Sequence, residues 1–375
     1  MSVSNLPRNL RNFPGWRISR RIVVIESDDW GSIRMPSNES FSKLQKERIN
    51  LNDLDALRYN INDTLESSDD LYALFEVLSS ESDYNGRLVV FTPVYVVANP
   101  DFNKIRESNF SEYFYEPFTS TLKKYYGNED SFRQLHQGIE KGIFVPQFHG
   151  REHLNVISWM KALREGERQT RLAFYEGFWG FVPDQKVMPG VDFQAAFLLA
   201  EPDEIEYHKK VITDGLNLFE KLFGYRAEYF VPPNGYLNNS LNIVLFENGI
   251  KYRSAANLQT EPLGKGKSRK VFHWLGQKDK SGLIYMKRNC FFEPSKPGKD
   301  WIDSCLYDIN SAFKCYKPAI ISSHRVNYIG RLNQSNRDKG LNQLKKLLKL
   351  IVKNWPDVEF MTTPELGKLI SSKSV

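Results

Sequence analysis

The sequence predicts an α/β fold: a distorted or partly open (β/α) barrel of seven or eight strand–helix units with long insertions. Short runs rich in β-branched residues alternate with longer stretches of helical periodicity, which is typical of a parallel sheet covered by helices. In addition, acidic and histidine side chains stand at the ends of several of these runs, where a parallel barrel places its active site.

Nine runs are predicted as strands from their β-branched content and flanking turn residues. They are 21–26, 87–97, 142–148, 227–231, 250–254, 271–274, 283–287, 318–323 and 358–361. Six stretches have the spacing of amphipathic helices. They are 69–80, 204–222, 238–248, 299–313, 339–354 and 364–371.

Two stretches between these elements are too long for ordinary connections. The polar, aromatic stretch 99–140 is predicted as an insertion, and the irregular, aromatic stretch 155–200 as a second insertion that borders a cleft. The length of 375 residues is enough for one large core, and we expect residues 1–375 to form a single catalytic barrel domain.

The C-terminal helical stretch 339–354 carries a leucine-rich stripe with lysines elsewhere. Such a helix could lie on a membrane surface. Because a strand and another helix follow it, a barrel helix with its apolar face on the sheet is favoured.

Charge and cysteine content bound the partners and the location. The net charge of +6 is spread along the chain, and the only tight basic run, 264–270, is predicted to be a solvated loop; nucleic acid is therefore not expected as a partner. The three cysteines form no CxxC pair, which favours a reducing compartment. Residues 1–21 lack a signal-peptide pattern, and no apolar run approaches the ~20 residues of a membrane span. We expect a cytoplasmic protein without an integral membrane segment, of unknown oligomeric state.

Candidate metal ligands stand at the predicted strand ends. Asp28 and Asp29 follow the first strand, His149 ends the third with His153 four residues later, and His324 ends the run 318–323. One carboxylate and two imidazoles form a plausible three-ligand set for Zn²⁺ or a similar ion, with positions left for water and substrate. If the chain turns helically at the two histidines, their spacing places both on one face.

Each of these pieces also has an ordinary structural explanation. Adjacent aspartates often form a turn or a helix cap, two histidines at this spacing can lie on a surface helix, and a rim histidine is often a satisfied structural residue. It is their combination in this order at strand ends that favours a metal site.

Five stretches, in chain order, resemble motifs of the NodB-homology polysaccharide deacetylases, which are carbohydrate esterase family four of the glycoside hydrolase/deacetylase superfamily. They are Ser27-Asp-Asp-Trp-Gly31 (T-F-D-D-G), His149-Gly-Arg-Glu-His153 (H-[ST]-x-x-H), 222–235 (ending F-R-P-P-Y-G), Ile321-Ser-Ser-His324 (L-x-H) and 360–366 (last strand and helix). The first stretch and His153-Leu-Asn155 also resemble the YdjC-like branch, which includes chito-oligosaccharide deacetylases.

The resemblance implies metal-dependent removal of an acetyl group, preferably N-acetyl, from a carbohydrate. Asp29, His149 and His153 would hold a divalent metal, Zn²⁺ first, with Co²⁺, Ni²⁺ or Mn²⁺ as alternatives. Asp28 would be the general base and His324 the general acid. The chemistry agrees, because a metal lowers the pKa of bound water, a neighbouring carboxylate can accept its proton, and a histidine can protonate the departing amine.

This sequence departs from the family at the residue that orients the base. Val231 stands where the family has an arginine, and Arg151, Arg288 and Arg325 are the candidates to replace it. The acid that tunes the final histidine is equally open. Asp300 begins an Asp-Trp pair like that of the family, whereas Glu293 lies nearer a strand end. Further residues are predicted to bind substrate or support the site: Trp30, Arg151, Pro233, Asn234, Gly235, Asn289, Asp300 and Arg325.

Two other functions stay open. Loss of the motif arginine favours a catalytically silent relative that binds an acetylated glycan, whereas retention of both aspartates and the final histidine argues for an enzyme. Nothing in the residues excludes a metal hydrolase of a non-sugar amide or ester.

Overall fold

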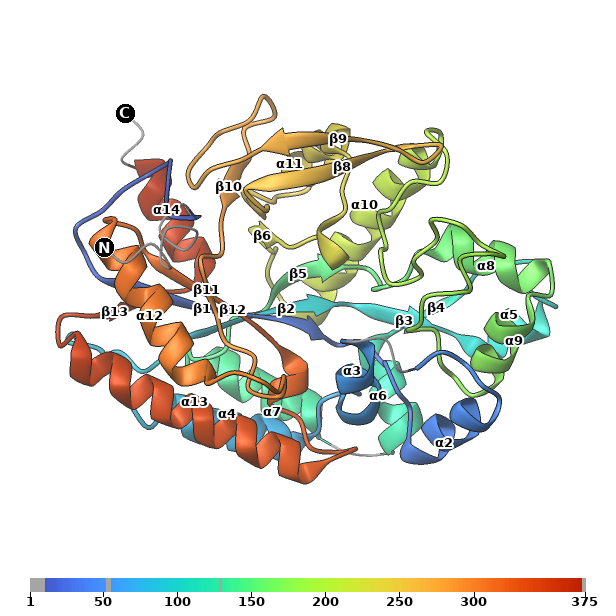
Figure 1. The fold of residues 1–375 in the computed structure, drawn as a ribbon, viewed down its shortest axis with the longest axis horizontal. Helices are drawn as coiled ribbons and strands as arrows, with labels where there is room; N and C mark the ends of the chain where they lie inside the picture. Colours follow the sequence, from blue (N-terminus) through green and yellow to red (C-terminus); the bar gives the residue numbers. More distant parts are fainter. Residues whose placement is uncertain (1–10, 52–54, 128–129, 373–375) are drawn as a thin grey trace.

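The computed structural model describes residues 11–51, 55–127 and 130–372 (Figure 1). Its centre is a parallel sheet with the strand order β10-β7-β6-β5-β2-β1-β12-β11, and β13 pairs with β1 outside this path. From β1 the order follows the chain around a barrel, which opens between β10 and β11, two strands joined by residues 287–289. The predicted partly open barrel is confirmed.

The strands of the main sheet are short and mostly buried. They are β1 Ile22–Trp30, β2 Phe91–Val96, β5 Gln147–Gly150, β6 Tyr229–Phe230, β7 Tyr252–Ser254, β10 Ile284–Met286, β11 Cys290–Phe291, β12 Ala319–His324 and β13 Glu359–Phe360. Two antiparallel hairpins lie outside this sheet. They are formed by β3 Ala98–Pro100 with β4 Tyr115–Pro117, and by β8 Leu258–Gly264 with β9 Lys267–Phe272.

The hairpin β8–β9 corrects two predictions. The run 271–274 is not a barrel strand, because its first residues end β9. The basic run 264–270 is not a loop, because it forms the turn and most of β9, although its lysines are exposed as expected. No barrel strand takes the place of this run, because β7 pairs directly with β10. The barrel strand that the sequence analysis missed is β11, which pairs with β12 and is too short to show a pattern in the sequence.

All six predicted helices are present, and the described residues form seven more. The helices are α2 Asn38–Lys46, α3 Ala56–Asn62, α4 Ser68–Leu78, α5 Phe102–Glu107, α6 Phe118–Tyr126, α7 Ser131–Glu140, α8 Val156–Arg164, α9 Arg168–Tyr175, α10 Glu204–Phe223, α11 Asn242–Glu247, α12 Trp301–Lys314, α13 Gln334–Asn354 and α14 Thr363–Ser372. Three 3₁₀ turns are also present: Pro233–Gly235, Asn239–Leu241 and Arg325–Asn327.

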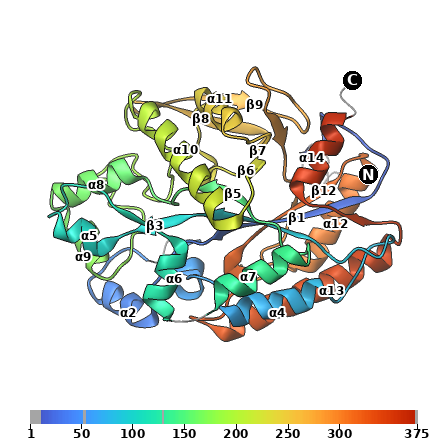
Figure 2. The same ribbon diagram turned by 180° about the vertical axis from the view of Figure 1, so that it is seen from behind.

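Helices α4, α7 and α13 lie along one flank of the barrel, and α10 lies across another (Figures 1 and 2). Helix α13 buries Leu344, Leu347 and Leu348 in the main hydrophobic core and packs against α4 and α12. The C-terminal amphipathic stretch is therefore a barrel helix, as predicted. Among the described residues, no helix is both long and apolar enough to cross a membrane. Of the segment 1–21, residues 1–10 lie outside the described residues.

The two long stretches between barrel elements share a second hydrophobic cluster at one end of the molecule (Figure 1). Phe102 of α5, Trp159 of α8 and Phe174 of α9 meet there, with their ring centroids 5.2–6.1 Å apart. The stretch 99–140 ends in α7, which packs against α4 in the barrel's helical layer. Helices α5, α8 and α9 therefore lie beside the carboxyl ends of β2 and β5, whereas α7 belongs to the barrel (Figure 1).

Candidate active site

The carboxyl ends of the barrel strands surround one pocket of about 890 Å³. Asp28 and Asp29 reach it from β1, His149 from the end of β5, His153 from the loop after it, and His324 from the end of β12. Residues far apart in the sequence meet here because parallel strands all end on the same side of the barrel.

Strand β1 runs through both aspartates instead of ending before them, which corrects the prediction. Its pairing with β2 shifts register between Ser27 and Trp30, and Asp29 has a φ of 75°, in the left-handed region. Such an irregularity re-aims side chains at a strand end. As a result, the neighbouring carboxylates of Asp28 and Asp29 have different partners.

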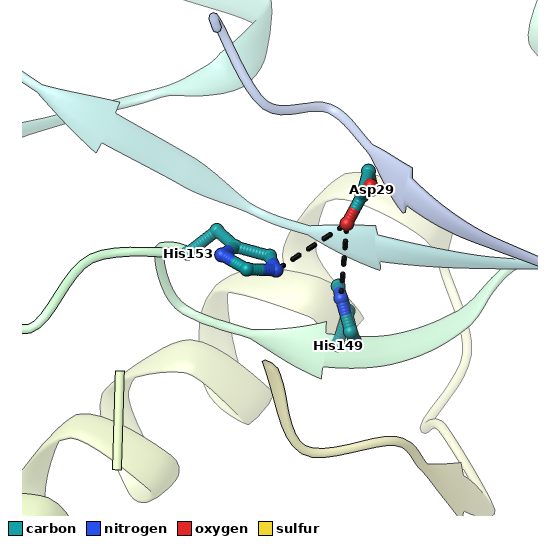
Figure 3. A group of neighbouring side chains, drawn as sticks. All are labelled: Asp29, His149 and His153. Atoms are coloured by element: carbon teal, nitrogen blue, oxygen red, sulfur yellow. Dashed lines mark ion pairs between the residues drawn. The ribbon is translucent and has the colours of Figure 1, made fainter. Parts of the chain in front are cut away.

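Asp29, His149 and His153 point toward one another (Figure 3). Asp29 Oδ1 lies 3.4 Å from His149 Nε2 and 3.3 Å from His153 Nε2, and all three side chains are buried. The predicted helical turn between the histidines is absent. His149 ends a strand, and Gly150 turns the chain at a φ of 134°, which brings His153 back to the same point.

The surroundings of these side chains fit a cation-binding set. His149 Nδ1 lies 2.7 Å from the carbonyl oxygen of Val231, and because a carbonyl only accepts, Nδ1 carries the proton. Nε2 therefore presents a lone pair; it is buried and forms no hydrogen bond with the described residues. Burial raises the pKa of Asp29, but the two imidazoles outweigh it and hold that pKa well below its usual value. Two oriented imidazoles beside an ionised carboxylate are a donor set suited to Zn²⁺ or a related ion.

Arg288, just after β10, holds Asp28. Its Nη1 and Nη2 donate to the two carboxylate oxygens of Asp28 at 2.6 and 2.5 Å, and its Nε donates to Glu26 at 2.5 Å. Burial raises the pKa of Asp28, and the guanidinium charge of Arg288 outweighs this and keeps it below its ordinary value. Among the three candidate arginines, Arg288 is the one that contacts Asp28. Val231 has no side-chain donor with which to do this.

Glu293, just after β11, holds His324. Their Nδ1–Oε1 distance is 2.5 Å, and Arg58 fixes the other oxygen of Glu293 at 2.7 Å. Burial lowers the pKa of His324, but Glu293 raises it more, to about 9. His324 Nε2 lies 3.9 Å from Asp28 Oδ2. Asp300, the other candidate, instead caps α12 by accepting from the Asp303 N–H, so its predicted role beside the histidine is wrong.

Three of the residues predicted to bind substrate or support the site do not line the pocket. Trp30 is 1% exposed and its indole N–H donates to Ser27. Arg151 is buried against Glu152, and the side chain of Asn289 bonds the backbone of Pro318 and Ile320. These side chains do not line the pocket, because each is held by protein partners behind it.

The loop after β6 matches its prediction more closely. Asn234 and Gly235 line the pocket, and Asn234, at a φ of 51°, donates from Nδ2 to Asp192. Pro233 is buried beside them, while its neighbour Pro232 faces the pocket.

Arg325 is a buried structural cation, and its replacement by methionine is expected to destabilise the fold. Its side chain is 0% exposed and donates to Asp63 at 3.1 Å and to Glu66 at 3.0 Å. Loss of this cation would leave two buried carboxylates without the charge that they are paired with, at about 3–5 kcal/mol of unfolding free energy. Chemical denaturation of Arg325→Met measures this change. A loss below about 1 kcal/mol, typical of exposed ion pairs, would contradict it.

Other residues in or next to the pocket carry no recognisable signal in the sequence: Tyr59 lines it, and the buried Trp179 packs on His153 without lining it. Trp179 stacks on His153 with ring centroids 6.2 Å apart, and the Tyr59 ring lies edge-on to His324 at 5.9 Å. Arg34 and Gln194 also line the pocket. They come from loops and a short helix whose place depends on the tertiary fold.

No family model matches the sequence, and no curated protein matches it. In fold, the chain is similar to a candidate polysaccharide deacetylase from Mycobacterium smegmatis (11% identity, TM-score 0.44, 96% of this chain and 94% of that one). It is also similar to a candidate glycoside hydrolase/deacetylase from Parabacteroides distasonis (10% identity, TM-score 0.49, 96% of this chain and 73% of that one). A third similar structure is a 4-alpha-glucanotransferase from Thermococcus litoralis (12% identity, TM-score 0.46, 95% of this chain and 41% of that one). Deacetylases of the polysaccharide type are thus among the solved structures to which this fold is similar.

Proposed function

We propose that the protein is a metal-dependent hydrolase that removes an acetyl group, preferably N-acetyl, from a sugar, oligosaccharide or polysaccharide. One observation carries the proposal: the buried set Asp29, His149 and His153 lies in the same pocket as a carboxylate held by an arginine, Asp28, and an imidazole held by Glu293, His324. Residues 1–375 would act as a single catalytic barrel domain.

Asp29, His149 and His153 would hold the divalent cation, with Zn²⁺ the first choice and Co²⁺, Ni²⁺ or Mn²⁺ as alternatives. When bound, the cation would polarise the acetyl carbonyl and lower the pKa of water. The Val231 carbonyl fixes the tautomer of His149, so the nitrogen that faces Asp29 is the one with a free lone pair.

Asp28 and His324 would move the protons. Arg288 keeps Asp28 ionised and fixes its orientation, which suits a base that takes a proton from the attacking water. His324 is protonated at neutral pH because Glu293 raises its pKa to about 9. Its Nδ1 is held by Glu293, so Nε2 is free to donate a proton to the departing amine nitrogen.

The pH profile of the reaction is expected to depend on Glu293. As pH rises through about 9, His324 loses the proton that it donates, so kcat should fall there; folding stability from this pair is present below about 6.5 and is lost over the same rise. In Glu293→Gln the carboxylate charge is gone, and the basic limb should move toward lower pH.

The control for this experiment is Asp300→Asn, which removes the other acid that the sequence left open. Asp300 caps α12 and does not contact His324, so the basic limb of kcat should stay where it is in the wild type. A limb that moves in Asp300→Asn and not in Glu293→Gln would refute the assignment.

The overall test is acetate release from a panel of N-acetylated oligosaccharides with added Zn²⁺ or Co²⁺, compared with Asp28→Asn. Release above that variant supports the proposal. No release from any glycan would favour a silent binding protein, although Arg288 now supplies the arginine whose absence motivated that alternative. Release from simple acetamides or acetyl esters alone would favour a non-sugar hydrolase.

We also propose a cytoplasmic location and an intracellular acetylated precursor or oligosaccharide as substrate. All three cysteines are free, which suits a reducing compartment. Detection of the native protein outside the cytoplasm by cell fractionation would overturn this part of the proposal.

A further inference from the structure

Arg34 is a buried cation that no carboxylate of the described residues contacts directly. It lies after β1, is 5% exposed and lines the pocket with the candidate catalytic residues. Its Nη2 donates to the amide oxygen of Gln194, and its Nε is buried without a hydrogen-bond partner. It forms no ion pair with any residue in the described part of the chain. Asp63 interacts with it electrostatically, but that carboxylate bonds Arg325.

Three other cations of the pocket have acidic partners, and two more, Arg11 and Lys299, are exposed and lie over aromatic rings. Arg288 is paired with Asp28, Arg58 with Glu293, and Lys296 lies 3.2 Å from Asp55. Arg253 also lacks an ion pair among the described residues, but asparagine side chains hold it and it does not line the pocket. A buried guanidinium without a carboxylate is costly to maintain unless something else supplies the charge. Arg34 lines the pocket, so an anionic ligand bound there could supply the missing negative charge.

Arg34 lies near the candidate catalytic residue His324, because both contact the ring of Tyr59. Its guanidinium lies 4.4 Å over the Tyr59 ring, and the same ring meets His324 edge-on at 5.9 Å. Arg34 and His324 are thus close enough for one sugar residue, or two neighbouring ones, to reach both. The stacking on Tyr59 and the bond to Gln194 hold the guanidinium in place, which suits recognition of an oxyanion by paired N–H donors.

From these contacts we infer that Arg34 binds an anionic group of the substrate, a carboxylate or a phosphate, beside the acetyl group that is removed. The inference rests on the proposed function and narrows its substrate class to acidic acetylated sugars. Gln194 is a positioning residue in this arrangement, because it holds the guanidinium through its amide oxygen.

The experiment compares three matched ligands: a neutral N-acetylhexosamine, the corresponding uronate, and the corresponding sugar phosphate. Dissociation constants are measured by calorimetry in Zn²⁺-treated Asp28→Asn protein, so that turnover does not interfere. We expect one of the anionic sugars to bind more tightly than the neutral one, and the tighter of the two identifies the anion. In Arg34→Met, that ligand should bind roughly tenfold to a hundredfold more weakly while the neutral sugar changes little.

Lys299→Met is the matched control, since Lys299 lies in the same pocket over the Trp301 ring. It should have a much smaller effect than Arg34→Met. The inference would be overturned if neither anionic sugar bound more tightly than the neutral one. It would also be overturned if Lys299→Met weakened binding of the anionic sugar as much as Arg34→Met, which would indicate a general electrostatic attraction. A third contrary result is an equal loss of affinity for neutral and anionic sugars in Arg34→Met. The melting temperature of Arg34→Met is measured beside binding, so that a loss of folded protein is told apart from a loss of the anion contact.

Acetate release separates this inference from the proposed function. If no acetate is released but Arg34 still controls binding of the acidic sugar, the anion site stands and the hydrolase proposal fails. If neutral and acidic sugars release acetate equally well, and equally in Arg34→Met, the hydrolase proposal stands and the anion site fails.

Discussion

His149→Ala is expected to remove both the bound metal and the activity. Wild-type protein purified with Zn²⁺ should contain about one divalent ion per chain, because one carboxylate and two imidazoles converge on a single point. The substitution deletes one of these donors, and Asp29 and His153 alone offer two. Acetate release should then fall to the level of the background reaction. Elemental analysis and the acetate assay on the same sample measure both effects.

The matched control for this variant is His136→Ala, in α7. His136 packs against Phe132 and does not line the pocket, so metal content and acetate release should remain at wild-type levels. The assignment would fail if metal-free wild-type protein were fully active, or if His149→Ala kept both its ion and its activity. Melting temperatures of both variants exclude unfolding as the cause.

Asp28→Asn is expected to separate catalysis from metal binding. Asparagine keeps the shape of the side chain but cannot take a proton, so kcat should fall by about 10²–10⁴-fold, the usual contribution of a general base. Metal content should stay at the wild-type level, because Asp28 faces Arg288 and not the two histidines. Loss of metal in Asp28→Asn would place this carboxylate among the ligands and contradict the division of roles between the two aspartates.

Arg288→Met tests the tether on the same base. Its effect on kcat should be smaller than that of Asp28→Asn, and the double variant should be no worse than Asp28→Asn alone, since the arginine acts through the aspartate. Losses that multiply in the double variant would show that Arg288 has a separate role. The cycle therefore measures whether these two side chains work as a unit.

The sequence predicted the barrel and the residues that converge on its rim because both depend on local patterns. β-Branched runs such as 318–323 mark buried strands, and polar residues that end such runs, including His149 and His324, meet wherever the strands are parallel. The prediction at 271–274 failed because an exposed hairpin strand and a buried barrel strand carry the same β-branched signal.

Local patterns do not show which side chains hold these residues in place. The sequence offered Arg288 and Glu293 only as alternatives among several candidates. Arg288 stands 260 residues from Asp28 and Glu293 stands 31 residues from His324, and only the curvature of the sheet brings each pair together. Asp300 matched the family's pattern in sequence, yet its side chain faces its own helix. Arg34 has no motif at all, and its lack of an acidic partner is visible only when all its neighbours are known.

The opening of the barrel between the edge strands β10 and β11, called the seam here, affects how heat or denaturant would act on the proposed activity. Residues 287–289 cross this seam, and their side chains fasten it to the rest of the barrel. Arg288 reaches Glu26 and Asp28 on β1, and Asn289 reaches the backbone at the start of β12. If heat or denaturant opens the barrel here first, the proposed base Asp28 loses its arginine while the candidate metal ligands, on β1, on β5 and in the loop after β5, stay together. Partial denaturation would then yield a protein that retains its ion but has stopped turning over.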